Sequence, residues 1–140
     1  MSTEPERLEQ GRGGSPPVGP EVVLDVELRS GAFVLVLANT GTSTAFEPRV
    51  RFDTKVTGLQ GELVVSDLPI WTGLAMLRPG SQVDVLLDVQ FARRAPEDRR
   101  FSVNVTYRDG AGRDVERAYT HDLDAYAGLP SLVAAPIPDA

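Results

Sequence analysis

The chain has 140 residues, of which 41% are hydrophobic and 24% are charged, which is the length and composition of one soluble globular domain. It contains no cysteine, and this excludes disulfides, thiolate metal sites and a cysteine nucleophile. The net charge of −6 argues against a nucleic-acid partner, because binding to phosphates requires an excess of positive charge.

The two ends of the chain differ in composition from its middle. Residues 1–20 are rich in glycine and proline with scarcely any large apolar side chain, so we expect a flexible N-terminal arm. We expect the folded domain over residues 21–124 and a proline-containing C-terminal tail over residues 125–140 that either packs back or serves as a peptide ligand. No apolar run has the length of a signal peptide or a membrane span. We therefore expect a cytoplasmic protein without membrane insertion, or an exported one if a signal precedes this sequence.

Three stretches alternate between apolar and polar residues, as half-buried strands require because successive side chains point to opposite faces. Their apolar members are Val22, Leu24, Val26 and Leu28; Val83, Val85, Leu87, Val89 and Phe91; and Phe101, Val103, Val105 and Tyr107. We therefore predict strands over 22–28, 82–91 and 100–108, with intervening carboxylates such as Asp84 and Asp88 on solvated faces.

The remaining strands are less regular. Residues 32–38 are apolar on both parities, which is typical of a central strand buried on both sides. A strand over 44–53 contains Pro48, which donates no ladder hydrogen bond, so this strand lies at an edge or carries a bulge. We predict short strands near 62–66 and 70–77, and a last strand over 113–123.

Turn residues separate these strands. Ser30-Gly31 indicates a tight turn, and Asn39 to Ser43 indicates a loop. Arg78-Pro79-Gly80-Ser81 favours a type II turn, since proline suits its second position and glycine its third. Asp109-Gly110-Ala111-Gly112 predicts a hairpin between the last two strands.

Three motifs carry a resemblance to a known family. They are Leu35-x-Leu37-Ala38-Asn39-x-Gly41-x-Ser43-x-Ala45, then Leu77-x-Pro79-Gly80, then Val103-x-Val105-x-Tyr107-x-Asp109-x-x-Gly112. Over about residues 22 to 123 the chain resembles bacterial immunoglobulin-like β-sandwich modules of the CARDB type. The resemblance implies an all-β, immunoglobulin-like antiparallel β-sandwich of about seven strands, with adhesive, spacer or docking roles instead of catalysis.

Few residues suggest a reactive or metal site. His121 is the one histidine, and its strand neighbour Asp122 points to the opposite face, so a catalytic couple is geometrically poor. Asp122 with Asp124, or Asp84 with Asp88, could hold calcium, but no dense loop of oxygen ligands surrounds them. We predict no catalytic residue, no metal site and no cofactor.

Candidate partner contacts lie in the irregular parts of the chain. Trp71 could be an aromatic platform for a sugar or an anchor for a protein, or it could close the open end of the sandwich. Arg93, Arg94, Arg99 and Arg100 form a basic cluster, interrupted by acidic residues, that could dock an acidic partner. Leu132, in the apolar C-terminal tail, is a further candidate contact.

Arg117 interrupts the apolar parity of the last strand. Either that strand is bulged or the side chain reaches past the sheet edge to solvent.

These observations predict a protein that is not an enzyme and that binds another protein or serves as a structural accessory module. A carbohydrate-binding or adhesive exported domain is one alternative. A structural subunit of a phage particle or secretion assembly is another.

Overall fold

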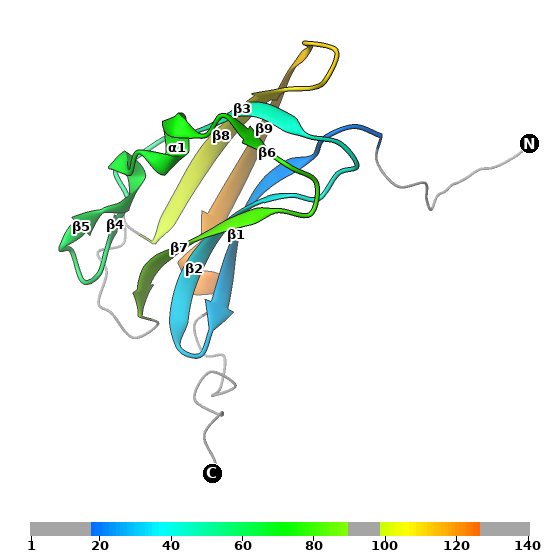
Figure 1. Cartoon of the computed structure of the whole chain (residues 1–140). Coiled ribbons are helices and arrows are strands. Elements are labelled where there is room, and N and C mark those ends of the chain that lie inside the picture. The colour runs from blue at the N-terminus through cyan, green and yellow to red at the C-terminus, as the bar shows by residue number, and fades with distance from the viewer. Residues whose placement is uncertain (1–17, 90–98, 127–140) are drawn as a thin grey trace, which may run out of the picture.

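The computed structural model describes residues 18–89 and 99–126 and shows two antiparallel sheets packed face to face (Figure 1). Sheet A has the strand order β1-β2-β7, and sheet B has the order β6-β3-β8-β9. The strands are β1 (Val22–Arg29), β2 (Ala32–Asn39), β3 (Ala45–Phe52), β6 (Met76–Leu77), β7 (Gln82–Val89), β8 (Arg100–Arg108) and β9 (Asp114–Asp122). The predicted β-sandwich is confirmed.

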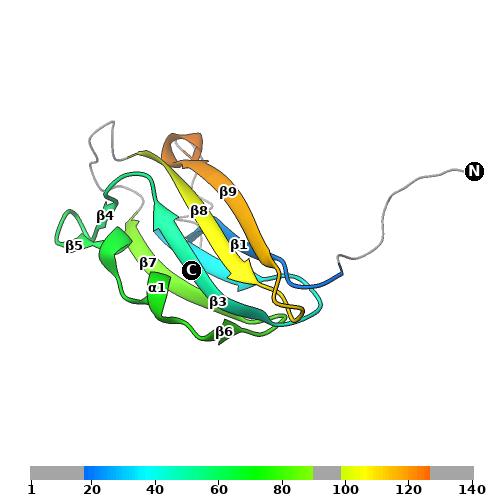
Figure 2. The ribbon, with the colours of Figure 1, turned by 90° about the horizontal axis from the view of Figure 1, so that it is seen from above.

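Smaller elements lie between β3 and β6. Strands β4 (Thr57–Gly58) and β5 (Leu63–Val64) form a short hairpin, followed by a 3-10 turn at Val65–Asp67 and one helical turn, α1 (Ile70–Gly73). A second 3-10 helix, η3 (Leu123–Tyr126), follows β9. Figure 2 shows the sheets as layers, with β1 and β9 side by side at one border of the sandwich.

The core lies between the sheets and contains the apolar parity of each alternating stretch. The most deeply buried members include Leu24, Leu35, Leu37, Phe101 and Val105. β2 is the middle strand of sheet A and is buried on both faces, as its sequence predicted, because its second face carries Val34 and Val36.

A bulge in β7 contradicts the simple alternation predicted for 82–91. The register against β2 shifts between Phe33 and Val34, so Leu87 and Asp88 both face the interior and Val89 faces out. Asp88 is 2% exposed, and its carboxylate accepts hydrogen bonds from the backbone amides of Gln60 at 3.0 Å and Val89 at 2.8 Å. The prediction of a solvated Asp88 and a buried Val89 is wrong. The extra residue in the bulge reverses the parity of the side chains, and the two amides compensate the buried carboxylate.

A second bulge resolves the ambiguity at Pro48. β3 lies between β6 and β8, so it is not an edge strand, and its register against β8 shifts between Phe46 and Arg49. Glu47 within this bulge has φ of 50°, and its amide donates to the Ala75 carbonyl at 2.8 Å. The proline is therefore accommodated by an irregularity inside the sheet.

The predicted strand over 70–77 is wrong in its first half. Residues 70–73 form the helical turn α1, and β6 covers only Met76 and Leu77. Pro69 explains the difference: its φ of −61° and ψ of −20° start a helical turn, and its carbonyl accepts the Thr72 amide at 3.1 Å. The predicted strand near 62–66 is likewise reduced to β5 and the 3-10 turn.

The predicted turns are confirmed. Gly80 has φ of 80° and the Ser81 amide donates to the Arg78 carbonyl at 3.0 Å, as a type II turn requires. The Asp109 carboxylate organises the last hairpin, since its Oδ1 accepts the backbone amides of Ala111 and Arg113, each at 2.9 Å.

Asn39 lies at the end of β2, beside the turn at residues 78–81, and is 1% exposed. Its Oδ1 accepts the amides of Glu21 and Gly41, and its Nδ2 donates to the carbonyls of Ser43 and Leu77. A Cβ at Gly41 would lie 2.2 Å from the Gly19 carbonyl oxygen, so this loop needs glycine. One buried amide thus joins the start of β1, the loop after β2 and the end of β6.

Candidate functional site

The outer face of sheet A carries exposed apolar side chains on β7. Leu86 is 50% exposed and Val89 is 45% exposed, while Val34 lies beside Leu86 on β2 and is largely buried. The bulge at Leu87 creates this pair, because it turns Val89 onto the same face as Leu86. We call Leu86, Val89, Val34 and the neighbouring Leu59 the sheet A patch.

Leu59 joins this patch through the β4–β5 hairpin, which docks on the edge of β7. The Leu59 amide donates to the Leu87 carbonyl at 2.9 Å, and the Leu59 side chain is 41% exposed. Leu59 and Gln60 have φ of 51° and 59°, a left-handed conformation that bulky residues rarely adopt. A Cβ on Gly58 would lie 2.1 Å from the Leu87 carbonyl oxygen, so glycine permits this close approach.

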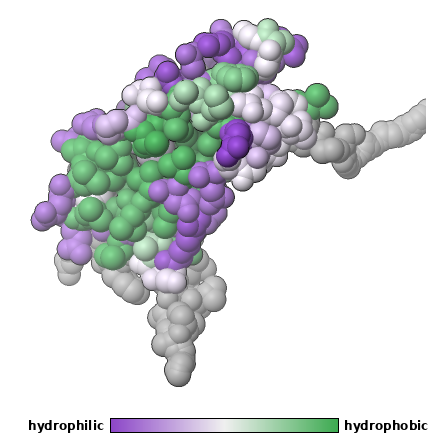
Figure 3. Space-filling model, in the orientation of Figure 1, coloured by the Kyte–Doolittle hydropathy of each residue, from purple (hydrophilic) through white to green (hydrophobic). Residues whose placement is uncertain are grey.

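Charged residues border the patch on the β1 side. Arg29 bonds Glu27 on its own strand and reaches across β2 to Asp84 on β7, with an Nη1 to Oδ2 distance of 2.8 Å. The Arg29 hydrogen bond, aided by one from Gln82, lowers the pKa of Asp84. In Figure 3 a continuous hydrophobic area lies over part of β7 and beside the β4–β5 hairpin, and it ends at a hydrophilic band on the β1 side. The arrangement is an apolar centre with an ionic border.

Trp71 lies in the core and is 1% exposed. Its ring contacts Phe52 edge-on with centroids 5.3 Å apart, and its Nε1 donates to the Val65 carbonyl at 2.7 Å. No ring face is therefore available to a sugar or a partner protein. The prediction of Trp71 as a contact residue is wrong, and its alternative role in closing the sandwich fits the structure.

The basic cluster is only partly described. Arg93, Arg94 and Leu132 lie outside the described residues. Arg99 is half-buried beside η3, where its Nη1 lies 3.7 Å from Asp124 and its carbonyl accepts the Leu123 amide at 2.7 Å. Arg100 is exposed at the start of β8, opposite Asp122.

His121 has a structural hydrogen bond. Its Nε2 lies 2.8 Å from the Leu24 carbonyl oxygen, and its ring packs 5.6 Å from that of Phe101. Since the carbonyl can only accept, the histidine donates from Nε2. Tyr119 and Tyr126 make the equivalent bonds to the carbonyls of Val22 and Val26, each at 3.1 Å. These three side chains cover the outer edge of β1.

Neither suggested pair of aspartates forms a metal site. Asp84 is exposed and paired with Arg29, whereas Asp88 faces the interior, so the bulge separates them. The Asp122 carboxylate accepts the Asp124 amide at 2.9 Å and so shapes the turn into η3. Within residues 18–89 and 99–126, no group of three or more potential ligating residues could hold a metal ion.

The Arg117 side chain reaches past the sheet edge, and its strand is not bulged. β9 is in regular register with β8 throughout, and the Arg117 side chain reaches past the edge to Glu21 at 3.6 Å.

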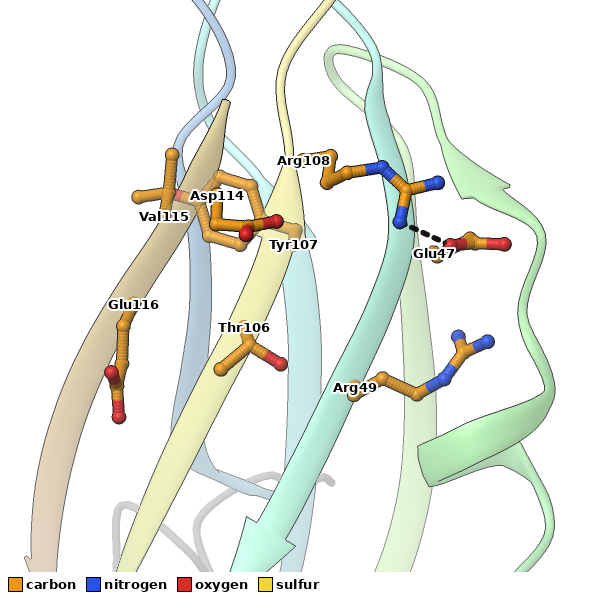
Figure 4. Close-up of a pocket in the computed structure, with 8 residues that line it drawn as sticks. All are labelled: Glu47, Arg49, Thr106, Tyr107, Arg108, Asp114, Val115 and Glu116. Atoms are coloured by element: carbon orange, nitrogen blue, oxygen red, sulfur yellow. Dashed lines mark ion pairs between the residues drawn. The ribbon is translucent and has the colours of Figure 1, made fainter. Parts of the chain in front are cut away.

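A shallow groove also lies on the outer face of sheet B, between the β8–β9 hairpin and the β3 bulge (Figure 4). Its Arg108 pairs with Glu47 at 2.5 Å, and its Arg49 donates to the carbonyls of Pro48 and Leu74. Because the chain itself engages both guanidinium groups, the groove offers little unpaired positive charge. We therefore regard the sheet A patch as the candidate site.

Sequence reasoning missed this patch. Leu86 gave a signal, since it is an apolar residue on the otherwise polar parity of its strand. Val89 gave none, because only the bulge brings it to the outer face.

A family model described as a domain of unknown function (DUF8453) matches residues 6–127. The chain belongs to this family. No curated protein matches the chain in sequence. None of the helices in the described residues is long and apolar enough to cross a membrane.

Proposed function

We propose that this domain is an immunoglobulin-like sandwich that acts as a non-catalytic, protein-binding accessory module through the sheet A patch. The strand distribution supports the fold assignment. In sequence order, β1, β2 and β7 correspond to immunoglobulin strands A, B and E in one sheet, and β3, β8 and β9 to strands C, F and G in the other. The resemblance to CARDB-type modules is part of the same proposal.

The observation that carries the binding role is the pair Leu86 and Val89, about half exposed on adjacent outward positions. Protein interfaces combine an apolar centre with a polar rim, and the Arg29 ion pairs supply such a rim here. A sheet face that needed only solubility would carry polar residues at these positions. The partner we propose is another protein, with a complementary apolar surface.

The engagement of His121 supports a non-catalytic role. Its donor nitrogen is held by the Leu24 carbonyl, and its ring is half-buried against Phe101. The Nε2 hydrogen bond gives this histidine a structural part in covering β1, which accounts for its place in β9 without a catalytic role.

Site-specific photo-crosslinking in the native cells tests the proposal. A photoreactive amino acid is placed at Leu86 and, as a matched control, at Met76, which is 49% exposed on β6 of the other sheet. We expect a defined protein adduct from position 86, abolished by Val89→Asp, and none from position 76. Identical products at both positions, or an adduct at 86 that Val89→Asp leaves unchanged, would contradict the proposal.

A further inference from the structure

The described strands include four that end a sheet, namely β1 and β7 in sheet A and β6 and β9 in sheet B. An unpaired edge strand presents a row of amide and carbonyl groups that can pair with another chain. Proteins usually block such edges, and the structure shows how three of these four are blocked or shortened.

Side chains from β9 and η3 cover β1. The carbonyls of Val22, Leu24 and Val26 accept bonds from the two tyrosines and the histidine described above. The Val26 amide is also satisfied, since it donates to Oδ1 of Asp25 at 2.8 Å. An incoming strand would find these groups occupied.

β7 and β6 offer no long regular edge. β7 is bulged at Leu87, and the Leu87 carbonyl already accepts the Leu59 amide from the β4–β5 hairpin. β6 contains two residues.

β9 differs from the other three. It runs for nine residues without proline, glycine or a bulge, in continuous register with β8. The flanking bonds, from the Asp109 amide to the Arg113 carbonyl and from the Leu123 amide to the Arg99 carbonyl, fix which β9 residues bond β8. Hydrogen-bonded and non-hydrogen-bonded pairs alternate in an antiparallel ladder. The amides and carbonyls of the odd-numbered β9 residues therefore bond to β8, and those of the even-numbered residues point to the free edge.

The free groups are concentrated in the middle of β9. In the described part of the chain, no hydrogen bond reaches the amide or carbonyl of Ala118 or Thr120, or the amide of Glu116. The Glu116 carbonyl accepts only the exposed guanidinium of Arg117, at 3.0 Å. All the even-numbered residues of β9, whose amides and carbonyls point to this edge, are exposed.

Charge indicates what would pair there. The outward side chains of β9 include the carboxylates of Asp114, Glu116 and Asp122, and its one arginine, Arg117, is already paired with Glu21. On the neighbouring β8, Arg108 opposite Asp114 is paired with Glu47, Arg100 lies opposite Asp122, and Asn104 donates to the Glu116 carboxylate at 2.6 Å. A second copy of this chain is a poor occupant, because antiparallel pairing about Ala118 would place Asp114 of one copy opposite Asp122 of the other. Like charges directly opposite each other destabilise a pair of strands, and opposite charges stabilise it.

We propose that the edge of β9 binds an extended segment of a partner protein that carries basic residues at alternate positions, and that this segment adds a strand to sheet B. Main-chain hydrogen bonds to Glu116, Ala118 and Thr120 give the affinity, and the outward carboxylates select basic side chains. This surface lies on the opposite sheet from the sheet A patch, so the two proposals stand or fall separately.

The test uses two synthetic nine-residue peptides, one of alternating lysine and valine and one of alternating glutamate and valine. Titration at low salt is combined with amide hydrogen exchange of the whole protein by NMR. We expect the lysine peptide alone to bind, and the amides of Ala118 and Thr120 to exchange fast in the free protein and at least about tenfold more slowly when the peptide saturates it.

Ala118→Pro separates strand addition from general charge attraction. Proline removes an amide that faces away from β8, so it breaks no bond of the existing ladder and suits an edge strand. It should weaken binding of the lysine peptide about tenfold or more, whereas Ala118→Val, which keeps the amide, should leave binding within about threefold. If Ala118→Pro fails to fold, the test of strand addition is the slower exchange of the Ala118 and Thr120 amides in the wild-type protein with the lysine peptide.

Five results would each overturn the proposal. The first two are failure of the lysine peptide to bind, and binding that does not protect the amides of Ala118 and Thr120. The next two are equal binding of both peptides, and a folded Ala118→Pro variant that binds the lysine peptide as the wild type does. The last is protection of the same amides in the free protein that rises with its concentration, which would assign the edge to a second copy.

Discussion

Replacing Asn39 with alanine should destabilise the domain more than any single surface change. The side chain makes four hydrogen bonds, to Glu21, Gly41, Ser43 and Leu77, and alanine removes all of them. The Leu77 carbonyl is buried and cannot regain a partner easily, which costs about 1–3 kcal/mol. The other three groups are partly buried, so water replaces part of each bond, and each adds about 0.5–1 kcal/mol.

The expected loss for Asn39→Ala is therefore about 2.5–6 kcal/mol, a large share of the roughly 5–15 kcal/mol that stabilises a typical domain. Urea unfolding followed by tryptophan fluorescence measures it, because Trp71 is the single tryptophan and is buried. Thr40→Ala is the matched control, since Thr40 is exposed and its hydroxyl makes one long bond, 3.3 Å, to the Glu21 carbonyl. This control should lose about 0.5 kcal/mol or less.

A loss below about 1 kcal/mol for Asn39→Ala, or one equal to that of Thr40→Ala, would refute the reasoning. It would mean that the loop after β2 keeps its conformation without the buried amide.

Three further outcomes are expected. The pKa of Asp109 is lowered, first by the hydrogen bond from the Arg113 amide, so its contribution to stability is present above the unfolded-state pKa and disappears as the pH falls through the lower folded-state value. The stability difference between wild type and Asp109→Asn should accordingly vanish in strong acid, and urea unfolding over a pH series would expose a constant difference as an error. Gly58→Ala should cost about 1–3 kcal/mol because its Cβ would strike a β7 carbonyl, whereas Gly110→Ala, with nothing within 4 Å of the new Cβ, should be close to neutral; equal thermal shifts would contradict this. Trp71→Ala should cost about 3–5 kcal/mol by leaving a core cavity, and calorimetry showing a loss typical of a surface residue would argue against burial.

The sequence predicted the regular part of the fold because that part follows from period-two alternation and turn residues. Phe101 to Tyr107, for example, has its apolar parity in the core, and Gly80 has the positive φ that a type II turn demands. The irregular part was predicted poorly for a physical reason. A bulge changes parity without changing composition, so nothing in the residues around Leu87 reveals that Asp88 turns inward.

The candidate site was predicted least well. Trp71 attracted attention as a large aromatic residue, but the helical turn started by Pro69 places it inside the sandwich. The unpaired edge of β9 has no signature in residue type, because pairing of backbone groups depends on strand order. Strand order in turn depends on contacts between distant parts of the chain.

The bonds that cover the β1 carbonyls join residues 97 and 100 positions apart. Loops of that length close late, because their entropy must be offset before the contact forms. During synthesis the first strand therefore leaves the ribosome with its outer edge bare, and it stays so until residues 119–126 have emerged. A nascent chain stalled before that point would expose an unpaired strand edge that is prone to aggregate. Loss of residues 119–126 should therefore be more harmful than the small length of that segment suggests.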